Sequence, residues 1–142
     1  MSNGEIPENA FKTGAHEKDG KPLFVARVHE LGIHPGKLCR GRQGAHIPIN
    51  GKEHLKRKYE VLASFAGLYW KSISVGNLPE DAVSTGYNVH KTPLYSARGW
   101  IDGNEVIGKY NYKENKALFP FGGKEHRLGL GEEVKILCCQ ED

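Results

Sequence analysis

The chain has 142 residues, of which 38% are hydrophobic and 26% charged, as in an ordinary globular protein. The net charge of +3 is small, and the longest basic run, Lys56-Arg57-Lys58, is short, so we do not expect a nucleic-acid-binding protein. No apolar stretch approaches the length of a membrane-spanning helix, and the polar start predicts no signal peptide. Three cysteines, an odd number, argue against a disulfide framework. We therefore expect a cytosolic protein without membrane insertion, whose release, if any, follows an unconventional route.

The chain contains 18 glycines, and so many turn-forming residues favour short strands over long helices. In chain order, Pro7-Glu8-Asn9-Ala10 reappears as Pro79-Glu80-Asp81-Ala82, and Gly36-Lys37 as Gly108-Lys109. The tetrapeptide Gly-Lys-Glu-His begins at Gly51 and again at Gly123. Such an ordered series indicates two tandem repeats, residues 1–70 and 71–142.

Each repeat has β-favouring segments separated by turn residues. The segment 64–76 is too apolar for a free linker, so we expect it to add a further strand. The predicted fold is all-β: two similar antiparallel units, packed or intertwined as a compact sandwich-like architecture. The predicted strands cover residues 23–28, 45–49 and 59–63 in the first repeat and 94–98, 117–121 and 134–138 in the second.

Several motifs suggest chemistry that we do not favour. Gly103 and Gly108-Lys109 have the spacing of a phosphate-binding loop, but Tyr110 replaces the Ser or Thr that would bind magnesium. The seven histidines form no closely spaced metal-ligand cluster. Each Gly-Lys-Glu-His follows an apolar strand, so we expect an exposed turn with solvated Lys and Glu and a His bonded to nearby backbone. We therefore expect neither a metal, nor another cofactor, nor an enzyme.

A polar cluster precedes the first Pro-Leu-aromatic strand of each repeat. In the first repeat it is His16-Glu17-Lys18-Asp19, and in the second it includes Asn88 and His90. If these clusters lie at the same end of the sheet as Lys37 and Lys109, an acceptor and an ammonium group face one ligand. Such a pair suits the vicinal hydroxyls of a sugar ring. An ordinary surface salt bridge is the alternative.

The ordered motifs resemble the DM-nine (DM9) repeat, and the resemblance covers nearly the whole chain in two copies. The pattern consists of Pro-x-(Asn/Asp)-Ala, Pro-Leu-(Phe/Tyr)-x-x-Arg, Gly-Lys, and Gly-Lys-Glu-His. Members of the family include a mannose-binding lectin with two repeats. The resemblance implies an intertwined all-β fold, a homodimer and recognition of mannose without calcium, in innate immunity or host–microbe recognition. The pore-forming module of natterin-like proteins is not expected here.

The resemblance also implies which residues bind the sugar. The lysine falls on Lys37, within Pro35-Gly36-Lys37, and the acidic residue is expected to be Glu17, with His16 and Asp19 as alternatives. In the second repeat Asn88 stands at the acidic position and Ile107 replaces the proline before Gly108-Lys109, so we expect weaker or no binding there. A non-catalytic protein-interaction scaffold with a surface near residues 65–70 is the competing interpretation.

Overall fold

The structure, a computed structural model, describes residues 2–140, and within them the chain forms strands and no helix. The predicted all-β class is confirmed. No described helix, accordingly, is long and apolar enough to cross a membrane. The strands in chain order are β1 (Leu23–His29), β2 (Gly32–Cys39), β3 (Ala45–Ile49), β4 (Lys52–Lys56), β5 (Glu60–Val61), β6 (Leu68–Ser74), β7 (Ser84–Asn88), β8 (Pro93–Ile101), β9 (Asn104–Asn111), β10 (Lys116–Phe121), β11 (Lys124–Leu128) and β12 (Glu133–Cys139).

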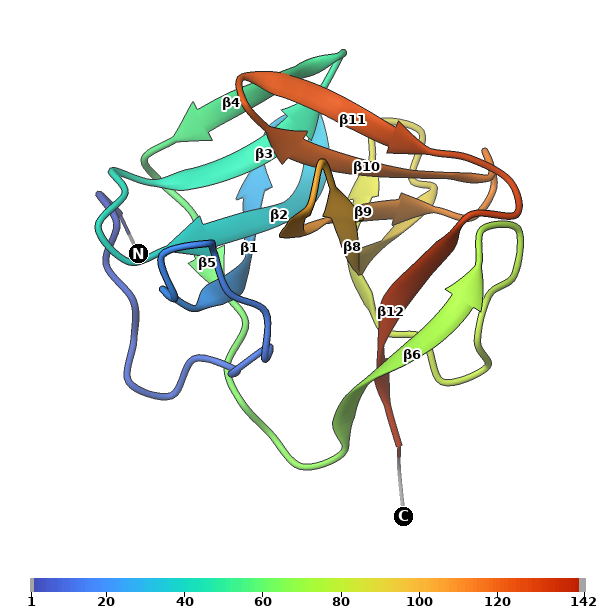
Figure 1. The fold of residues 1–142 in the computed structure, drawn as a ribbon, viewed down its shortest axis with the longest axis horizontal. Coiled ribbons are helices and arrows are strands. Elements are labelled where there is room, and N and C mark those ends of the chain that lie inside the picture. Colours follow the sequence, from blue (N-terminus) through green and yellow to red (C-terminus); the bar gives the residue numbers. More distant parts are fainter. Residues whose placement is uncertain (1, 141–142) are drawn as a thin grey trace.

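The strands form one continuous sheet that closes on itself (Figure 1). The order runs β2-β3-β4-β11-β10-β9-β8, and β7 pairs with both β8 and β2, which completes a ring of eight strands. Strands β1 and β5 extend the sheet beyond β2, while β12 and β6 extend it beyond β8. The sandwich-like packing of two units is not confirmed, because the two repeats share this single hydrogen-bonded sheet. The expected strand in segment 64–76 is β6, which pairs along the whole of β12.

Tight hairpins set the register within each repeat. Asn50-Gly51, Asp102-Gly103 and Gly122-Gly123 each occupy a two-residue loop with positive φ at both positions. This geometry follows the right-handed twist of antiparallel strands and favours Gly, Asn and Asp. The local sequence therefore determines where these strands reverse.

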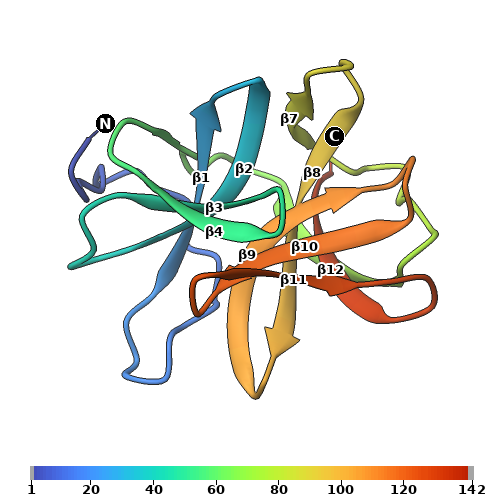
Figure 2. The ribbon, with the colours of Figure 1, turned by 90° about the horizontal axis from the view of Figure 1, so that it is seen from above.

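Close crossings explain the glycine of each Gly-Lys pair. Strands β3 and β4 cross over β1 and β2 at a steep angle (Figure 2). A Cβ atom at Gly36 would lie 2.3 Å from the carbonyl oxygen of His46, and one at Gly108 would lie 2.1 Å from that of Leu118. Only glycine lets the two backbones approach this closely. The Gly-Lys pairs thus lie inside β2 and β9.

The two Gly-Lys-Glu-His tetrapeptides form the junction between the repeats. The backbone N–H of Glu53 donates to the carbonyl of Gly123 (3.2 Å), and that of Glu125 donates to Gly51 (3.0 Å). The side chains reciprocate, since Oε1 of Glu53 accepts from Gly123 N–H (2.8 Å) and Oε1 of Glu125 from Gly51 N–H (3.3 Å). The backbone N–H groups at the facing edges of β4 and β11 are therefore hydrogen-bonded to the other repeat.

This junction corrects the expectation that the tetrapeptides are solvated turns. Each turn ends at the glycine of the tetrapeptide, Gly51 or Gly123, and β4 and β11 begin at the following residues, Lys52 and Lys124. The two lysines are exposed as expected, but the Glu53 side chain is only 12% exposed. The prediction for the histidines is confirmed: Nε2 of His54 lies 3.1 Å from the carbonyl oxygen of Ile49, and the second histidine bonds Phe121 in the same way.

The core consists of one apolar cluster for each repeat and a smaller cluster between them. The first packs β1, β2 and β3, and the second packs β8 to β12 around Tyr110 and Phe119, both fully buried. The smaller cluster joins Leu23 and Val25 of the first repeat to Ile107 of the second. Interlocked burial of this kind fixes the relative position of the repeats, and hence of the side chains between them.

Candidate functional site

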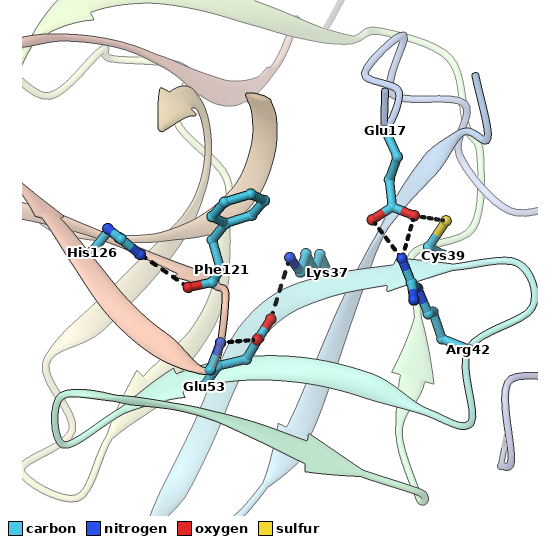
Figure 3. A network of polar contacts seen from close by, with 8 residues as sticks. Glu17, Lys37, Cys39, Arg42, Glu53, Phe121 and His126 are labelled. Atoms are coloured by element: carbon cyan, nitrogen blue, oxygen red, sulfur yellow. Dashed lines mark hydrogen bonds and ion pairs between the residues drawn. The ribbon is translucent and has the colours of Figure 1, made fainter. Parts of the chain in front are cut away.

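Two adjoining cavities, of about 240 and 220 Å³, lie between the repeats. Both are lined by Glu17, Lys37, Arg42 and Phe121 (Figure 3). Glu17 precedes β1, Lys37 lies on β2, and Arg42 lies between β2 and β3, whereas Phe121 ends β10 of the second repeat. The site is therefore built from both repeats.

Lys37 is held in place by two groups. The residue is 8% exposed, and its Nζ lies 3.3 Å from Oε2 of Glu53. The same ammonium group stands 5.4 Å from the ring centroid of Phe121, close enough for a cation–π interaction. Because Glu53 also accepts a hydrogen bond from Gly123, the junction between the repeats positions Lys37.

Glu17 presents a fixed carboxylate to the same space. Arg42 donates to both of its oxygens, at 3.0 and 3.2 Å, and the thiol of Cys39 donates to Oε1 at 3.0 Å. Burial alone raises the pKa of Glu17, but the hydrogen bonds from Cys39 and Arg42 outweigh it and leave the pKa below its ordinary value. Glu17 is thus ionised at neutral pH.

The three cysteines are free thiols. Burial, together with the bond to Glu17, raises the pKa of Cys39 to about 12, and burial also raises the pKa of Cys138. Since the thiolate is the reactive form, both thiols are protected. Cys39 therefore serves the site as a neutral hydrogen-bond donor.

We expect an aromatic disulfide reagent at pH 8 to modify Cys139 of the native protein far faster than Cys39 or Cys138. Cys139 is half-buried, whereas the other two are buried. Absorbance of the released thiol should show one fast equivalent in buffer and all three in denaturant. Fast modification of Cys39 in the native protein would contradict the assigned contact with Glu17.

The alternative acidic-position residues are placed differently. Asp19 lines the 240 Å³ cavity together with Glu17, and its Oδ1 accepts from Lys21 N–H at 3.0 Å. His16 is exposed, pairs with Pro22 and lines neither cavity. The structure thus brings together Glu17, Asp19 and Lys37, and leaves His16 outside.

Sequence reasoning missed Arg42, Glu53 and Phe121. Phe121 arrives from the other repeat, so nothing near Glu17 or Lys37 in the sequence indicates it. Glu53 was assigned to a solvated turn. Arg42 follows a strand at a turn, where an isolated basic residue gives no reason to expect an ion pair with Glu17.

The second repeat has an equivalent cavity, of about 270 Å³, which contains Asn88, Lys109 and Glu125. Asn88 supports its own turn, because its Oδ1 accepts from the N–H groups of His90 and Thr92. Lys109 is 6% exposed, and its Nζ lies 2.9 Å from Nδ1 of His34, which comes from the first repeat. We call the adjoining pair the first cavity and this one the second cavity. The first presents a carboxylate held by Arg42 and Cys39, and the second an amide engaged by backbone.

Within residues 2–140, no group of three or more His, Cys, Asp or Glu side chains is arranged to hold a metal ion. The groups that line the two adjoining cavities include carboxylates, the Lys37 ammonium, the Arg42 guanidinium, the His46 imidazole and the Phe121 ring.

Two repeats that share a closed sheet, with a lysine-containing cavity in each, define a class of tandem-repeat all-β proteins. The chain matches the family described as DM9 repeat over residues 17–128, and it belongs to that family. No curated protein matches the sequence. Among solved structures, the nematode sperm cell motility protein MFP2B is similar, with a TM-score of 0.73 at 17% identity. That similarity covers 99% of this chain but 44% of MFP2B, so the chain spans less than half of that protein, and the likeness shows the fold alone.

Proposed function

We propose that the protein is a non-catalytic lectin that binds mannose-type sugars at the first cavity without calcium. The observation that supports this most directly is that the Glu17 carboxylate and the Lys37 ammonium line the same pair of cavities. A carboxylate accepts hydrogen bonds from two neighbouring hydroxyls, and an ammonium donates to a third oxygen. The Phe121 ring offers an apolar surface to the C–H face of the sugar.

The site is preorganised, which favours binding of a ligand with many exchangeable hydroxyls. Arg42 and Cys39 fix the Glu17 carboxylate, and Glu53 fixes Lys37. Binding of a sugar therefore carries little entropy cost for ordering these side chains. Sugar hydroxyls exchange water for protein with little net gain, so single-site affinity should be on the order of millimolar to high micromolar.

Calorimetric titration with mannose, in the presence of excess chelator and with galactose as the control sugar, tests the proposal. We expect mannose to bind and Glu17→Gln, which keeps the shape but removes the charge, to weaken binding by roughly tenfold or more, since charge-assisted hydrogen bonds are the strong ones. His16→Ala is the matched control, because His16 neighbours Glu17 but lines neither cavity. Absence of mannose binding well into the millimolar range would refute the proposal.

We propose further that the protein acts as a homodimer in innate immune or host–microbe recognition. When two or more weak sites bind one glycan surface together, the apparent affinity exceeds that of a single site. Glycan surfaces that repeat mannose units suit such avidity.

A second candidate function is a non-catalytic protein-interaction scaffold. It is favoured by an apolar cavity of about 350 Å³ that includes Val25, Val61 and Phe65, the last 51% exposed. Trp70, by contrast, is anchored, since its Nε1 donates to the carbonyl of Thr13 at 2.9 Å. Recovery of one stoichiometric partner that mannose does not displace, and that Phe65→Ser does, would favour the scaffold.

A further inference from the structure

The second cavity combines an apolar entrance with a buried amine. Leu31 and Val89, which are 71% and 60% exposed, lie at its entrance, and Ile49 and Leu94 add apolar surface. Lys109 lines the same cavity, as do Glu114, Lys116 and Glu125, although the Lys109 residue is only 6% exposed. A small molecule with an apolar tail would place its polar end at this amine.

The partner of Lys109 differs from that of its counterpart Lys37. Lys37 forms an ion pair with Glu53 at 3.3 Å, whereas Nζ of Lys109 donates to Nδ1 of His34 at 2.9 Å. Across residues 2–140, no carboxylate lies within ion-pair distance of the Lys109 ammonium group. Lys109 is therefore bonded to an imidazole, which can accept a proton, whereas Lys37 faces a carboxylate, which favours the charged ammonium.

The imidazole of His34 directs a lone pair at the Lys109 amine. Nε2 of His34 lies 3.1 Å from the carbonyl oxygen of Leu31, so Nε2 carries the hydrogen and Nδ1 has the free lone pair. Burial lowers the pKa of His34, and the charge of Lys109 lowers it further, so the ring is neutral. A neutral base thus faces the amine directly.

The surroundings of Lys109 also favour its uncharged form. Burial lowers the pKa of Lys109 to about 8, with Glu125 on β11 and Glu114 beyond β9 opposing this shift and Lys116 on β10 adding to it. A substantial fraction of free amine is then present near neutral pH. Lysines desolvated in apolar pockets are the ones that react with carbonyl compounds.

We propose that Lys109 is a nucleophilic amine that forms a reversible imine with small aliphatic aldehydes admitted by the second cavity. His34 first takes a proton from the ammonium group. The lone pair of Nζ then attacks the carbonyl carbon, which forms the C–N bond and a carbinolamine. His34 returns the proton to the hydroxyl, the C–O bond breaks, water leaves, and a protonated imine remains. One ammonium and one aldehyde give one iminium and one water, with no oxidant or reductant.

Reductive trapping tests this proposal on the intact wild-type chain. Propanal is added at pH 7.4 with cyanoborohydride, which delivers hydride to the imine carbon, and each lysine is followed by peptide mass spectrometry. We expect Lys109 to be alkylated at least about tenfold faster than Lys37, because Lys37 is ion-paired with Glu53, whereas Lys109 faces the neutral ring of His34 and its own pKa is lowered to about 8. Alkylation of Lys109 no faster than that of Lys37 and the exposed Lys52 would overturn the proposal.

Two variants separate the chemistry from simple accessibility. Lys109→Arg retains the charge but cannot form the imine, so alkylation at this position should vanish while the rates at other lysines stay unchanged. His34→Gln retains a hydrogen-bond acceptor but cannot carry the proton, and we expect it to slow alkylation of Lys109 by several fold and to change its pH profile between pH 6 and 9. An unchanged rate and profile in His34→Gln would overturn the role of His34. Formation of the adduct should leave mannose binding at the first cavity intact.

Discussion

Replacing Lys37 with methionine should lower the free energy of unfolding by about 3 kcal/mol and abolish mannose binding. The substitution keeps the length of the side chain but leaves the buried Glu53 carboxylate without its ion-pair partner at 3.3 Å. Breaking a buried pair is costly because the remaining charge has lost its water as well as its partner. Urea denaturation followed by fluorescence measures the first effect, and calorimetry with mannose the second.

The same substitution at the equivalent position of the second repeat should have the opposite sign. Lys109→Met removes a buried amine whose folded-state pKa is reduced from 10.5 to about 8, so below pH 8 the wild type bears the cost of keeping it charged. We expect Lys109→Met to raise the unfolding free energy at pH 7 by about 1 to 3 kcal/mol. If both variants were destabilised equally, the two lysines would not differ as the structure indicates.

The pH dependence of stability is an independent test of whether the charged form of Lys109 destabilises the folded protein. Between pH 8 and 10.5 the unfolded chain holds the Lys109 proton that the folded protein has released, so the contribution of Lys109 to stability rises with pH in this window. The difference in stability between Lys109→Met and wild type should therefore shrink from pH 7 to pH 10.

Gly108→Ala should lower the free energy of unfolding by roughly 3 kcal/mol or more, the other large effect that we expect. The added methyl group would lie 2.1 Å from the carbonyl oxygen of Leu118 and 2.8 Å from Cδ1 of Phe119, so β9 and β10 must separate. Overpacking at a backbone crossing cannot be relieved by a change of side-chain rotamer. Thermal unfolding followed by circular dichroism measures the loss.

Gly129→Ala is the matched control for this substitution. Its φ is not positive, and the nearest atom to an added Cβ is Oε1 of Glu132 at 4.0 Å, which is ordinary contact. We expect a change within about 0.5 kcal/mol, as for most surface substitutions. Equal losses in the two variants would mean that loss of glycine flexibility, and not the close crossing, explains the effect at Gly108.

The local structure of this protein could be predicted from the sequence. Pro-Leu-aromatic segments start β1 and β8, and the turn residues at Asn50-Gly51 and Gly122-Gly123 end β3 and β10 within a residue of the prediction. Strand pattern and hairpin turns depend on neighbours in the chain, which is why composition and spacing were sufficient. The repeat and the resemblance to the DM9 family followed from the same local motifs, and that resemblance implied Glu17, with His16 and Asp19 as alternatives, together with Lys37; the structure places Glu17, Asp19 and Lys37 along one cavity.

The way in which the repeats join, and the groups that surround each lysine, depend on tertiary contacts. The closed ring depends on β7 meeting β2 of the other repeat, a pairing between segments more than fifty residues apart that local propensity does not encode. The same junction buries Glu53 beside Lys37 and places His34, not a carboxylate, beside Lys109. Two lysines in the same motif therefore differ in the group opposite: Lys37 meets Glu53 of its own repeat, whereas Lys109 meets His34 of the other repeat.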